Sequence, residues 1–429
     1  MIRTVERNIS EEIKKIHTRT AFIDRKESEV VCNILKDIRE QGDVALLGYI
    51  NKFEFPAKNI KDIVVTKEAL KLAYDTSSEQ LKNLLNVATE NIRSYHQNFL
   101  LNSWQEKIYE NSSYGMKVTS IKRVGVYVPG GTAAYPTSVL MNVIPAQVAG
   151  VEEIVLASPA GKDGQIDNSV LAAAYLLGIK EVYSVGGAQA VGALAYGTES
   201  IKKVDKIVGP GNIYVTLAKK EVFGVVGIDK MAGPSDVCII ADDSADPRFI
   251  AADMLAQAEH DTLASAILIT ESRELAKKVK TQLALQYKEL PRKQILDRAL
   301  SDNSLIIVQE GADVKKLAKI ADQIAAEHLE IFHVKQEELV NNISHAGAIF
   351  VGEYSAEVLG DYMLGPNHVL PTGGTARFSS PLSAIDFQKY TTVVRMDKSD
   401  FPKVGKDTAY FADIEKLPAH AKAARIRIS

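Results

Sequence analysis

The strongest constraint on the fold is one order of elements, apolar strand, glycine turn and apolar helix, which repeats between residues 122 and 228. The order is visible in VGVYVPGG, EEIVLASPAG, EVYSVGGAQAVGAL and DKIVGPGNIYVTLAKK, each of which leads into or contains a helical pattern. Strands that alternate with helices at this spacing form a parallel sheet with helices packed on its faces. After residue 236 the same order returns in SAILIT, SLIIVQ, LEIFHV and GAIFVG, so the sequence predicts two α/β units.

The rest of the chain supplies helices and a hairpin around these two units. Its 429 residues predict more than one domain, because a single core rarely grows past about 250–300 residues. Apolar periodicity predicts helices over residues 9–17, 28–49 and 67–99, and the NSS turn at 111–113 predicts a hairpin. The first α/β unit interrupts the chain, so we expect it to be inserted between the parts of the second.

Composition excludes several classes of protein. Apolar residues make up 46% of the chain and charged residues 24%, as in an ordinary globular protein. The 51 basic and 54 acidic residues give a net charge of −3, which predicts no nucleic-acid or membrane partner. No apolar run reaches the roughly 20 residues of a membrane span, and the polar amino terminus lacks a signal peptide, so a cytoplasmic location is expected. The two cysteines, Cys32 and Cys238, form neither a disulfide framework nor a CxxC site.

Glycine turns stand between the strands and the helices of the first unit. In parallel sheets such turns lie beside helix amino termini, where phosphates and dinucleotides bind. No turn contains the GxGxxG pattern. Tight connections that need positive φ explain the glycines equally well, so both interpretations stay open here.

A polar group stands out between residues 231 and 261, where a strand, a polar loop and a helix are predicted. Gln257 and His260 are three residues apart, so we expect them on one face of that helix. Ser235 lies just before the strand. An amide oxygen, an imidazole and a hydroxyl in one place suggest a metal or polar-ligand site, although His260 could equally cap the helix or lie on the surface.

An acid–base pair, Glu327 and His328, lies where a predicted helix gives way to a strand. Such a pair could activate water and move a proton at neutral pH. The alternative is a surface glutamate beside a packed histidine.

Further possible ligands lie near the carboxyl terminus. Asp361 lies on a long glycine- and proline-rich loop, and His420 follows Glu415 by five residues. With Gln257 and His260 they form an oxygen and nitrogen set without thiolate, which suits Zn²⁺ or Mn²⁺.

Several sequence blocks together resemble one known family. They are VGVYVPGGTAAYPTSVLMN, VGGAQAVGALAYGTESI, VDKIVGPGNIYV, AGPSDVCIIAD, MLAQAEHD, AAEHLEIF, GDYMLGPNHVLPT and KLPAH. In order and separation the sequence resembles the histidinol dehydrogenases over essentially its whole length. The resemblance implies oxidation of L-histidinol through L-histidinal to L-histidine, with reduction of two NAD, by a zinc-dependent homodimer.

The resemblance also implies roles for individual residues. It implies zinc ligands that also meet the substrate, at Gln257, His260, Asp361 and His420. It implies that Glu327 activates water, that His328 transfers protons and contacts the substrate, and that Ser235 and Glu415 bind the substrate. It implies NAD contacts at Tyr127, Gln189 and Asn212, one in each of three glycine turns. In this family the carboxyl-terminal segment reaches the partner's site, so Glu415 and His420 are expected to act in trans.

The implied fold is α/β, with two Rossmann-like domains similar to those of aldehyde dehydrogenases and helical extensions at both ends. We expect a helical arm over 1–25 and a discontinuous domain over 26–126 and 236–381. An inserted NAD domain over 127–235 and a carboxyl-terminal extension over 382–429 complete the chain.

The sequence departs from the family pattern at four positions, none of them an expected ligand. Asp236 replaces a glutamate, Ala326 a proline, Lys416 a glycine, and Lys230 a residue that is usually neutral. Asp236 could loosen the support of Ser235. Two alternatives therefore stay open: a dehydrogenase of another alcohol on the same scaffold, and a catalytically silent zinc-binding relative.

Overall fold

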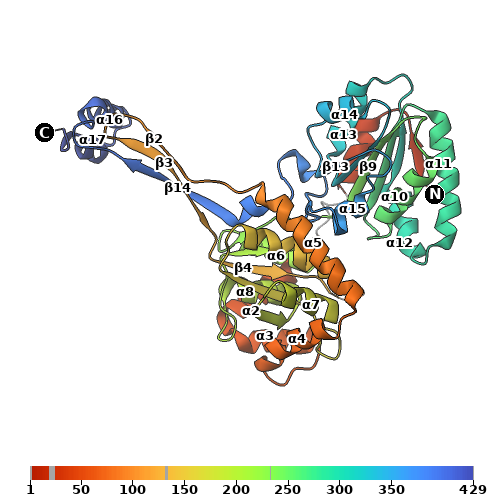
Figure 1. Ribbon diagram of the computed structural model, residues 1–429, viewed down its shortest axis with the longest axis horizontal. Coiled ribbons are helices and arrows are strands. Elements are labelled where there is room, and N and C mark those ends of the chain that lie inside the picture. Colours follow the sequence, from red (N-terminus) through yellow and green to blue (C-terminus); the bar gives the residue numbers. More distant parts are fainter. Residues whose placement is uncertain (1, 19–24, 131–133, 232, 429) are drawn as a thin grey trace.

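The computed structural model describes residues 2–18, 25–130, 134–231 and 233–428. It contains two parallel sheets, each covered by helices, and a slender antiparallel arm that extends away from both (Figure 1). The predicted α/β class with two parallel sheets is confirmed.

The first sheet has five parallel strands in the order β6-β5-β4-β7-β8. From β4 the chain moves outward through β5 and β6 and then returns to the other side of β4, so the strand order reverses between β4 and β7. The strands are β4 (Arg123–Tyr127), β5 (Glu153–Ser158), β6 (Glu181–Ser184), β7 (Lys206–Val208) and β8 (Gly227–Ile228). The helices between them are α6 (Pro136–Val148), α7 (Asn168–Leu176), α8 (Gly187–Tyr196) and α9 (Ile213–Val222).

Helices from the amino-terminal quarter cover this sheet as well. They are α2 (Arg25–Gln41), α3 (Asp43–Phe53), the 3₁₀ turn η1 (Ile60–Ile63), α4 (Lys67–Asp75) and α5 (Glu79–Gln97). Ile34 and Ile38 of α2 are buried against α8, while Leu85 and Ile92 of α5 belong to the core on the opposite face. The prediction that this helical segment shares a domain with 236–381 is therefore wrong. Its apolar faces complete the core of the inserted unit.

Two of the predicted long helices are each divided in two. The helix predicted over 28–49 stops at Gln41, because Gly42 takes a positive φ of 52° and a new helix starts at Asp43. The helix predicted over 67–99 stops at Asp75, and the Ser78 side chain accepts a hydrogen bond that caps the next helix. Apolar spacing continues across both breaks, so periodicity alone could not locate them.

The second sheet has six parallel strands in the order β1-β11-β10-β9-β12-β13. The strands are β1 (Arg3–Val5), β9 (Asp236–Ala241), β10 (Ser265–Thr270), β11 (Leu305–Val308), β12 (His328–Phe332) and β13 (Ala348–Val351). The helices are α1 (Ile9–Thr18), α10 (Pro247–Ala258), α11 (Arg273–Gln286), α12 (Lys293–Arg298), α13 (Val314–Ile324), α14 (Gln336–Asn342) and α15 (Glu357–Tyr362), and the short turns are η2 (Tyr287–Glu289), η3 (Ala299–Asn303) and η4 (Thr375–Arg377). The last short turn, η5 (Ala384–Phe387), packs in the core of the first sheet instead.

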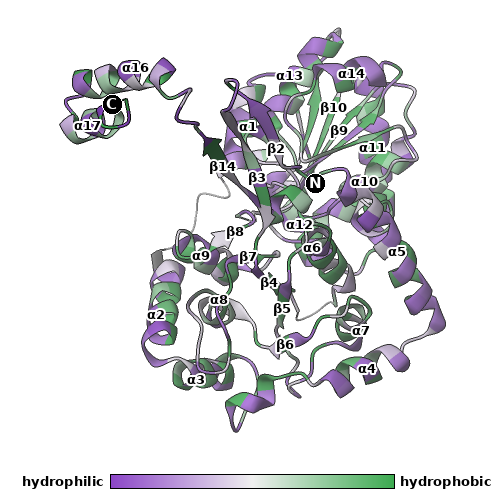
Figure 2. Cartoon of the chain, turned by 60° about the vertical axis from the view of Figure 1, so that its left-hand side comes forward, coloured by the Kyte–Doolittle hydropathy of each residue, from purple (hydrophilic) through white to green (hydrophobic). Residues whose placement is uncertain are grey.

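The central strands of the second sheet are hydrophobic along their length, as strands covered on both faces must be (Figure 2). The strand order reverses between β9 and β12. The predicted separate arm over 1–25 is wrong for its described part, because β1 pairs with β11 and α1 packs on α13.

The arm is a three-stranded antiparallel ribbon of β2 (Trp104–Lys107), β3 (Ser113–Ser120) and β14 (Gln388–Arg395). The pairing of β2 with β3 confirms the hairpin predicted at residues 111–113. The end of the arm carries α16 (Pro402–Ile414) and α17 (Pro418–Arg425), far from both sheets in Figure 1. None of the helices that the structure describes is both long and apolar enough to cross a membrane.

Candidate active site

Five of the predicted site residues come together at the amino edge of the second sheet. His328 is the first residue of β12 and pairs with Val237, the second residue of β9. Ser235 comes immediately before β9, and Glu327 immediately before β12. Gln257 lies in the last turn of α10, which runs back to this edge, and Asp361 lies in α15.

The imidazole of His328 is at the centre of this group and is 4% exposed. Its Nδ1 lies 2.9 Å from Gln257 Oε1 and 3.2 Å from Glu357 Oε2, while its Nε2 lies 3.8 Å from Asp361 Oδ1. Burial alone would lower the pKa of His328. The nearby carboxylate of Glu357 raises this pKa, and the carboxylates of Glu327 and Asp361 raise it further. Together the three carboxyl groups raise the pKa to about 10.

Glu327 is fully enclosed beside it. The pKa of Glu327 is raised to about 8, mainly by burial and also by the charge of Asp236. The charge of His328 and a hydrogen bond from Ser235 lower this pKa and so limit the rise. The backbone N–H of Glu327 donates to Asp236 Oδ1 at 2.6 Å, and the Asp236 N–H lies 3.4 Å from Glu327 Oε2. The aspartate that departs from the family pattern therefore holds the backbone of Glu327 in place.

Four buried polar atoms at this site have no hydrogen-bond partner within the described part of the chain: Gln257 Nε2, His328 Nε2, Glu330 Oε2 and Glu357 Oε2. Buried polar atoms are nearly always paired, so several unpaired atoms in one place indicate a site built to receive a ligand. The amide oxygen of Gln257 and the carboxylate of Asp361 are oxygen donors without a competing thiolate, which fits a borderline divalent cation.

The remaining predicted ligands lie elsewhere. Helix α10 ends at Ala258, and His260 lies in the exposed turn that follows, its backbone N–H 3.3 Å from the carbonyl of Gln257. The prediction that both share one helical face is wrong, although both lie at the same end of α10. Glu415 and His420 are exposed on the helices at the end of the arm, away from the His328 group.

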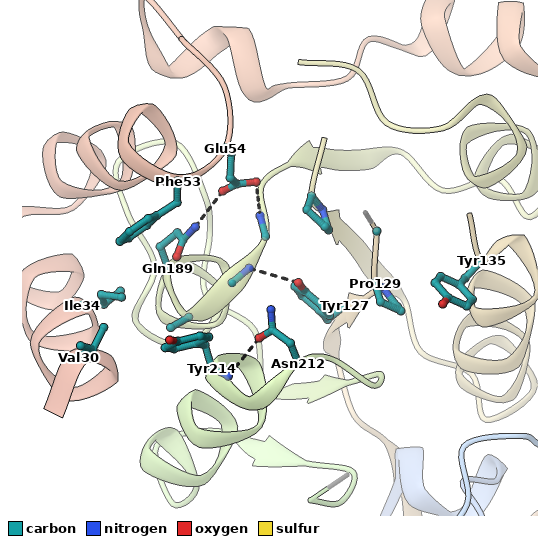
Figure 3. A pocket seen from close by; sticks show the side chains of 15 residues that line it. Val30, Ile34, Phe53, Glu54, Tyr127, Pro129, Tyr135, Gln189, Asn212 and Tyr214 are labelled. Carbon is teal, nitrogen blue, oxygen red and sulfur yellow. Dashed lines mark hydrogen bonds between the residues drawn. The ribbon is translucent and has the colours of Figure 1, made fainter. Parts of the chain in front are cut away.

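The predicted NAD residues line a cavity of about 520 Å³ at the carboxyl edge of the first sheet (Figure 3). Tyr127 ends β4, Gln189 lies in the first turn of α8, and Asn212 caps α9 by accepting from the backbone of Tyr214 and Val215. An adjoining cavity of about 530 Å³ continues along the ends of β4 and β5. The two cavities share the walls Pro129, Gly130 and Pro159.

One residue of this cavity was not predicted. Glu54, which follows α3, accepts from the Gly186 N–H and from Gln189 Nε2, both at 2.9 Å. Burial raises the pKa of Glu54, and these two hydrogen bonds oppose the rise. No motif surrounds Glu54, so only the packing of α3 against α8 brings it to the glycine turn before α8.

Contacts link this cavity to the His328 group. His368 Nδ1 lies 3.2 Å from the carbonyl oxygen of Asp361, and its Nε2 lies 3.4 Å from Ser138 Oγ in α6. Burial raises the pKa of Tyr362, and Asp361 and the cavity-lining Tyr135 raise it further. The cavity at the first sheet and the polar group at the second are therefore neighbours.

A second polar cluster lies at the opposite, carboxyl edge of the second sheet. Within the described ranges, Asp242, Glu271 and His333 are the one group of three acidic or imidazole side chains close enough together to hold a metal ion. His333 Nδ1 accepts from the Lys335 N–H at 2.9 Å, and Nε2 donates to Glu271 at 3.1 Å. Both ring nitrogens are thus already engaged, and the cluster contains none of the predicted zinc ligands.

Comparison with known proteins identifies the family of this chain. A sequence model described as histidinol dehydrogenase matches residues 17–428. The histidinol dehydrogenase of Bacillus subtilis is 49% identical over 402 residues, covering 94% of this chain and 93% of the relative. That of Dechloromonas aromatica is 42% identical over 428 residues, covering 100% and 98%.

A solved structure extends this match to the fold. The crystal structure of histidinol dehydrogenase from Elizabethkingia anophelis has a TM-score of 0.93 and 35% identity, and the match covers 100% of this chain and 98% of that one. With matches over this length and at this identity, the chain belongs to the histidinol dehydrogenase family of NAD-dependent oxidoreductases.

Proposed function

We propose that the chain, as a cytoplasmic enzyme, oxidises L-histidinol through L-histidinal to L-histidine at the His328 group, reducing two NAD. The observation that carries this proposal is the convergence of Ser235, Gln257, Glu327, His328 and Asp361 at one buried position beside the first-sheet cavity. Proton acceptors, cation ligands and a dinucleotide-sized cavity are the parts that such oxidations need.

NAD occupies the two adjoining cavities of the first sheet in this proposal. The amino termini of α8 and α9 lie at the first of these cavities, and helix amino termini favour the negative pyrophosphate. Tyr127, Gln189 and Asn212 line the cavity around these termini. Tyr135 lines this cavity, and Ser138 nearby contacts His368, which in turn contacts Asp361. We therefore expect the nicotinamide ring to point toward the second sheet.

Gln257, His260 and Asp361, with His420 from a second copy of the chain, would hold a zinc ion. When bound, zinc supplies a Lewis acid that takes the amine and imidazole nitrogens of the substrate. Ser235 and Glu415 would complete the substrate contacts.

The first oxidation needs a proton acceptor beside the alcohol. His328 Nε2 is buried, has no hydrogen-bond partner in the described chain and faces Asp361, so it takes the hydroxyl proton while the carbinol hydride goes to NAD. A metal ion held by Asp361 would add positive charge that offsets the carboxylates that raise the pKa of His328, and would so favour the neutral imidazole.

The second oxidation needs water. Glu327 takes one proton from a water molecule whose oxygen adds to the aldehyde carbon, giving the anion of the hydrate. This anion loses the second hydride to NAD and becomes the carboxylic acid, whose proton passes to His328 and leaves the carboxylate. Cys238 does not offer a thiol route, because it is fully buried in β9 and burial raises its thiol pKa.

The arm supports a site shared between two copies. Glu415 and His420 are exposed on helices that the ribbon holds away from their own sheets. Apolar residues around them are exposed as well, with Tyr410 at 66% and Phe411 at 67%. Exposed apolar surface of this kind is typical of an interface, and a second copy is the partner that lacks these two residues at its own site.

The test is NADH formation from L-histidinol by the zinc-loaded protein. Turnover should require the imidazole, so an amino alcohol without the ring is the control substrate. Mixing inactive His328→Ala with inactive His420→Ala protein should restore partial activity, because both lesions can fall in one site of a hybrid dimer. No NADH from histidinol would overturn the activity, and no recovery after verified subunit exchange would overturn the shared site.

A further inference from the structure

Three buried carboxyl groups lie close together beside His328. Glu330 is two residues along β12 and faces the same side of the sheet, Asp253 comes from α10, and Glu357 begins α15. Their exposed fractions are 0%, 9% and 2%. The reaction described above uses none of them, although buried carboxyl groups are costly unless they have a task.

Only one of the three touches the catalytic imidazole. Glu357 Oε2 lies 3.2 Å from His328 Nδ1. The backbone N–H of Glu357 donates to Glu330 Oε1 at 3.0 Å, which fixes the start of α15 against β12. Asp253 interacts with Glu330 and Glu357 rather than with the ring.

Two side-chain oxygens lie close enough to His328 Nδ1 to accept its one hydrogen bond. Gln257 Oε1 lies 2.9 Å from that nitrogen, slightly closer than the Glu357 oxygen. Gln257 is also a proposed zinc ligand, and its oxygen would then be directed at the cation. Glu357 is the acceptor that remains beside Nδ1 in the described part of the chain.

We propose that Glu357 is a positioning residue that keeps the proton of neutral His328 on Nδ1, so that the lone pair of Nε2 faces the substrate. This inference rests on the proposed role of His328 as the proton acceptor. A neutral imidazole carries one N–H, and the hydrogen bond at one nitrogen decides which nitrogen can act as the base. Glu357 also stabilises the imidazolium that forms once the substrate proton has been taken, as the carboxylate of a catalytic triad does.

The experiment compares Glu357→Gln with wild type and with the matched variant Asp253→Asn. Glu357→Gln should lower kcat for histidinol by roughly 10²–10⁴-fold with little change in KM, since substrate and NAD contacts are untouched. Zinc content and melting temperature should stay close to wild type. Asp253→Asn, which removes a buried carboxylate from the same cluster, should keep most of its kcat.

A second readout does not depend on turnover. ¹⁵N-histidine spectra of the zinc-loaded protein, with the His328 signals assigned by difference from His328→Asn, report which ring nitrogen carries the proton. Wild type and Asp253→Asn should show the Nδ1–H form, and Glu357→Gln should lose that preference. Glu357→Asp keeps the carboxylate but moves it away from Nδ1, so its preference for the Nδ1–H form should lie between those of wild type and Glu357→Gln. This variant replaces Glu357→Gln in the experiment if Glu357→Gln does not fold.

An unchanged kcat or an unchanged tautomer in Glu357→Gln would overturn the positioning role. An equal loss of kcat in Asp253→Asn would overturn it too, because the cluster as a whole would then be responsible. Absence of histidinol oxidation in wild type would instead reject the proposed function, and the spectra would still decide the tautomer question.

Discussion

The two parallel sheets have the same kind of strand order but present their chemistry at opposite edges. In the first sheet the order reverses between β4 and β7, and the cavity lies at the carboxyl edge beside that point, where open α/β sheets usually bind ligands. In the second sheet the order reverses between β9 and β12, yet the acid–base residues lie at the amino edge, where these strands begin. The carboxyl edge there holds the hydrogen-bonded group of Asp242, Glu271 and His333.

This difference shows that topology alone selects only one of the two sites. The first site lies where glycine turns meet helix amino termini, a position that strand order predicts. The second depends on side chains from β9, β12, α10 and α15, and strand order says nothing about them. The first sheet therefore presents an open cavity, and the second presents a buried group of acidic and imidazole side chains.

Removal of metal should have the largest effect on the second-sheet site and little effect on the first-sheet site. Exhaustive chelation is expected to abolish histidinol oxidation, because the proposed zinc ion is held at the second sheet by Gln257, His260 and Asp361. NADH binding at the first sheet, followed by fluorescence, and the melting curve should persist. Re-addition of Zn²⁺ is the control and should restore turnover. Full activity in protein shown by elemental analysis to be free of metal would contradict the assignment.

Within the second-sheet site, Glu327→Gln should divide the two oxidations. The change keeps size but removes the water-activating base, so oxidation of histidinal should fall by roughly 10²–10⁴-fold. Reduction of histidinal by NADH uses no activated water and should suffer far less. His328→Asn, the comparison variant, should impair both directions. Equal damage to both directions in Glu327→Gln would show that the glutamate positions the substrate instead.

At the first sheet, Gly187→Ala should weaken NAD binding without altering the chemical step. Gly187 has a φ of 64°, and an added Cβ would lie 2.7 Å from Gln189 Oε1. A strain of about 1–2 kcal/mol predicts a rise of roughly 5–30-fold in the KM for NAD, measured by initial rates.

Gly178→Ala is the matched control for that measurement. Gly178 has a similar φ of 71°, but no atom lies near its added Cβ within the described structure. It should lose similar stability and keep its KM for NAD. An equal rise of KM in both variants would indicate general strain rather than a cofactor contact.

The smallest expected effect concerns acid stability of the first unit. His96 is fully buried in α5, and burial lowers its pKa to about 4 from the ordinary 6.5. Below pH 6.5 the unfolded chain takes up the proton and the folded chain does not, so stability falls until the pH reaches about 4.

Urea unfolding should therefore show a loss of about 2 kcal/mol between pH 7 and pH 5 that His96→Met lacks. His345→Gln, in the second unit, should keep the wild-type loss. A wild-type pH dependence in His96→Met would place the acid sensitivity elsewhere.

The sequence predicted the repeating strands and the residues that meet at His328, because these lie in recognisable blocks. It misassigned the helices between residues 26 and 97, since apolar faces show that a helix packs but not on which sheet. It missed Glu54, Glu330 and Glu357, which come from segments that only tertiary packing brings to the two sites. It also extended the helix as far as His260, whereas α10 ends at Ala258, because a helix end depends on capping rather than on the spacing of ligands.

The protruding arm has a consequence for how activity depends on concentration. Within one chain the first-sheet cavity and the His328 group lie at the two sheets, whereas the helices that carry Glu415 and His420 lie at the far end of the ribbon. A freshly synthesised chain would then be inactive until it meets a second one, so turnover would follow second-order assembly. Specific activity should fall on dilution and recover on concentration, which makes the amount of enzyme itself a control on the rate per chain.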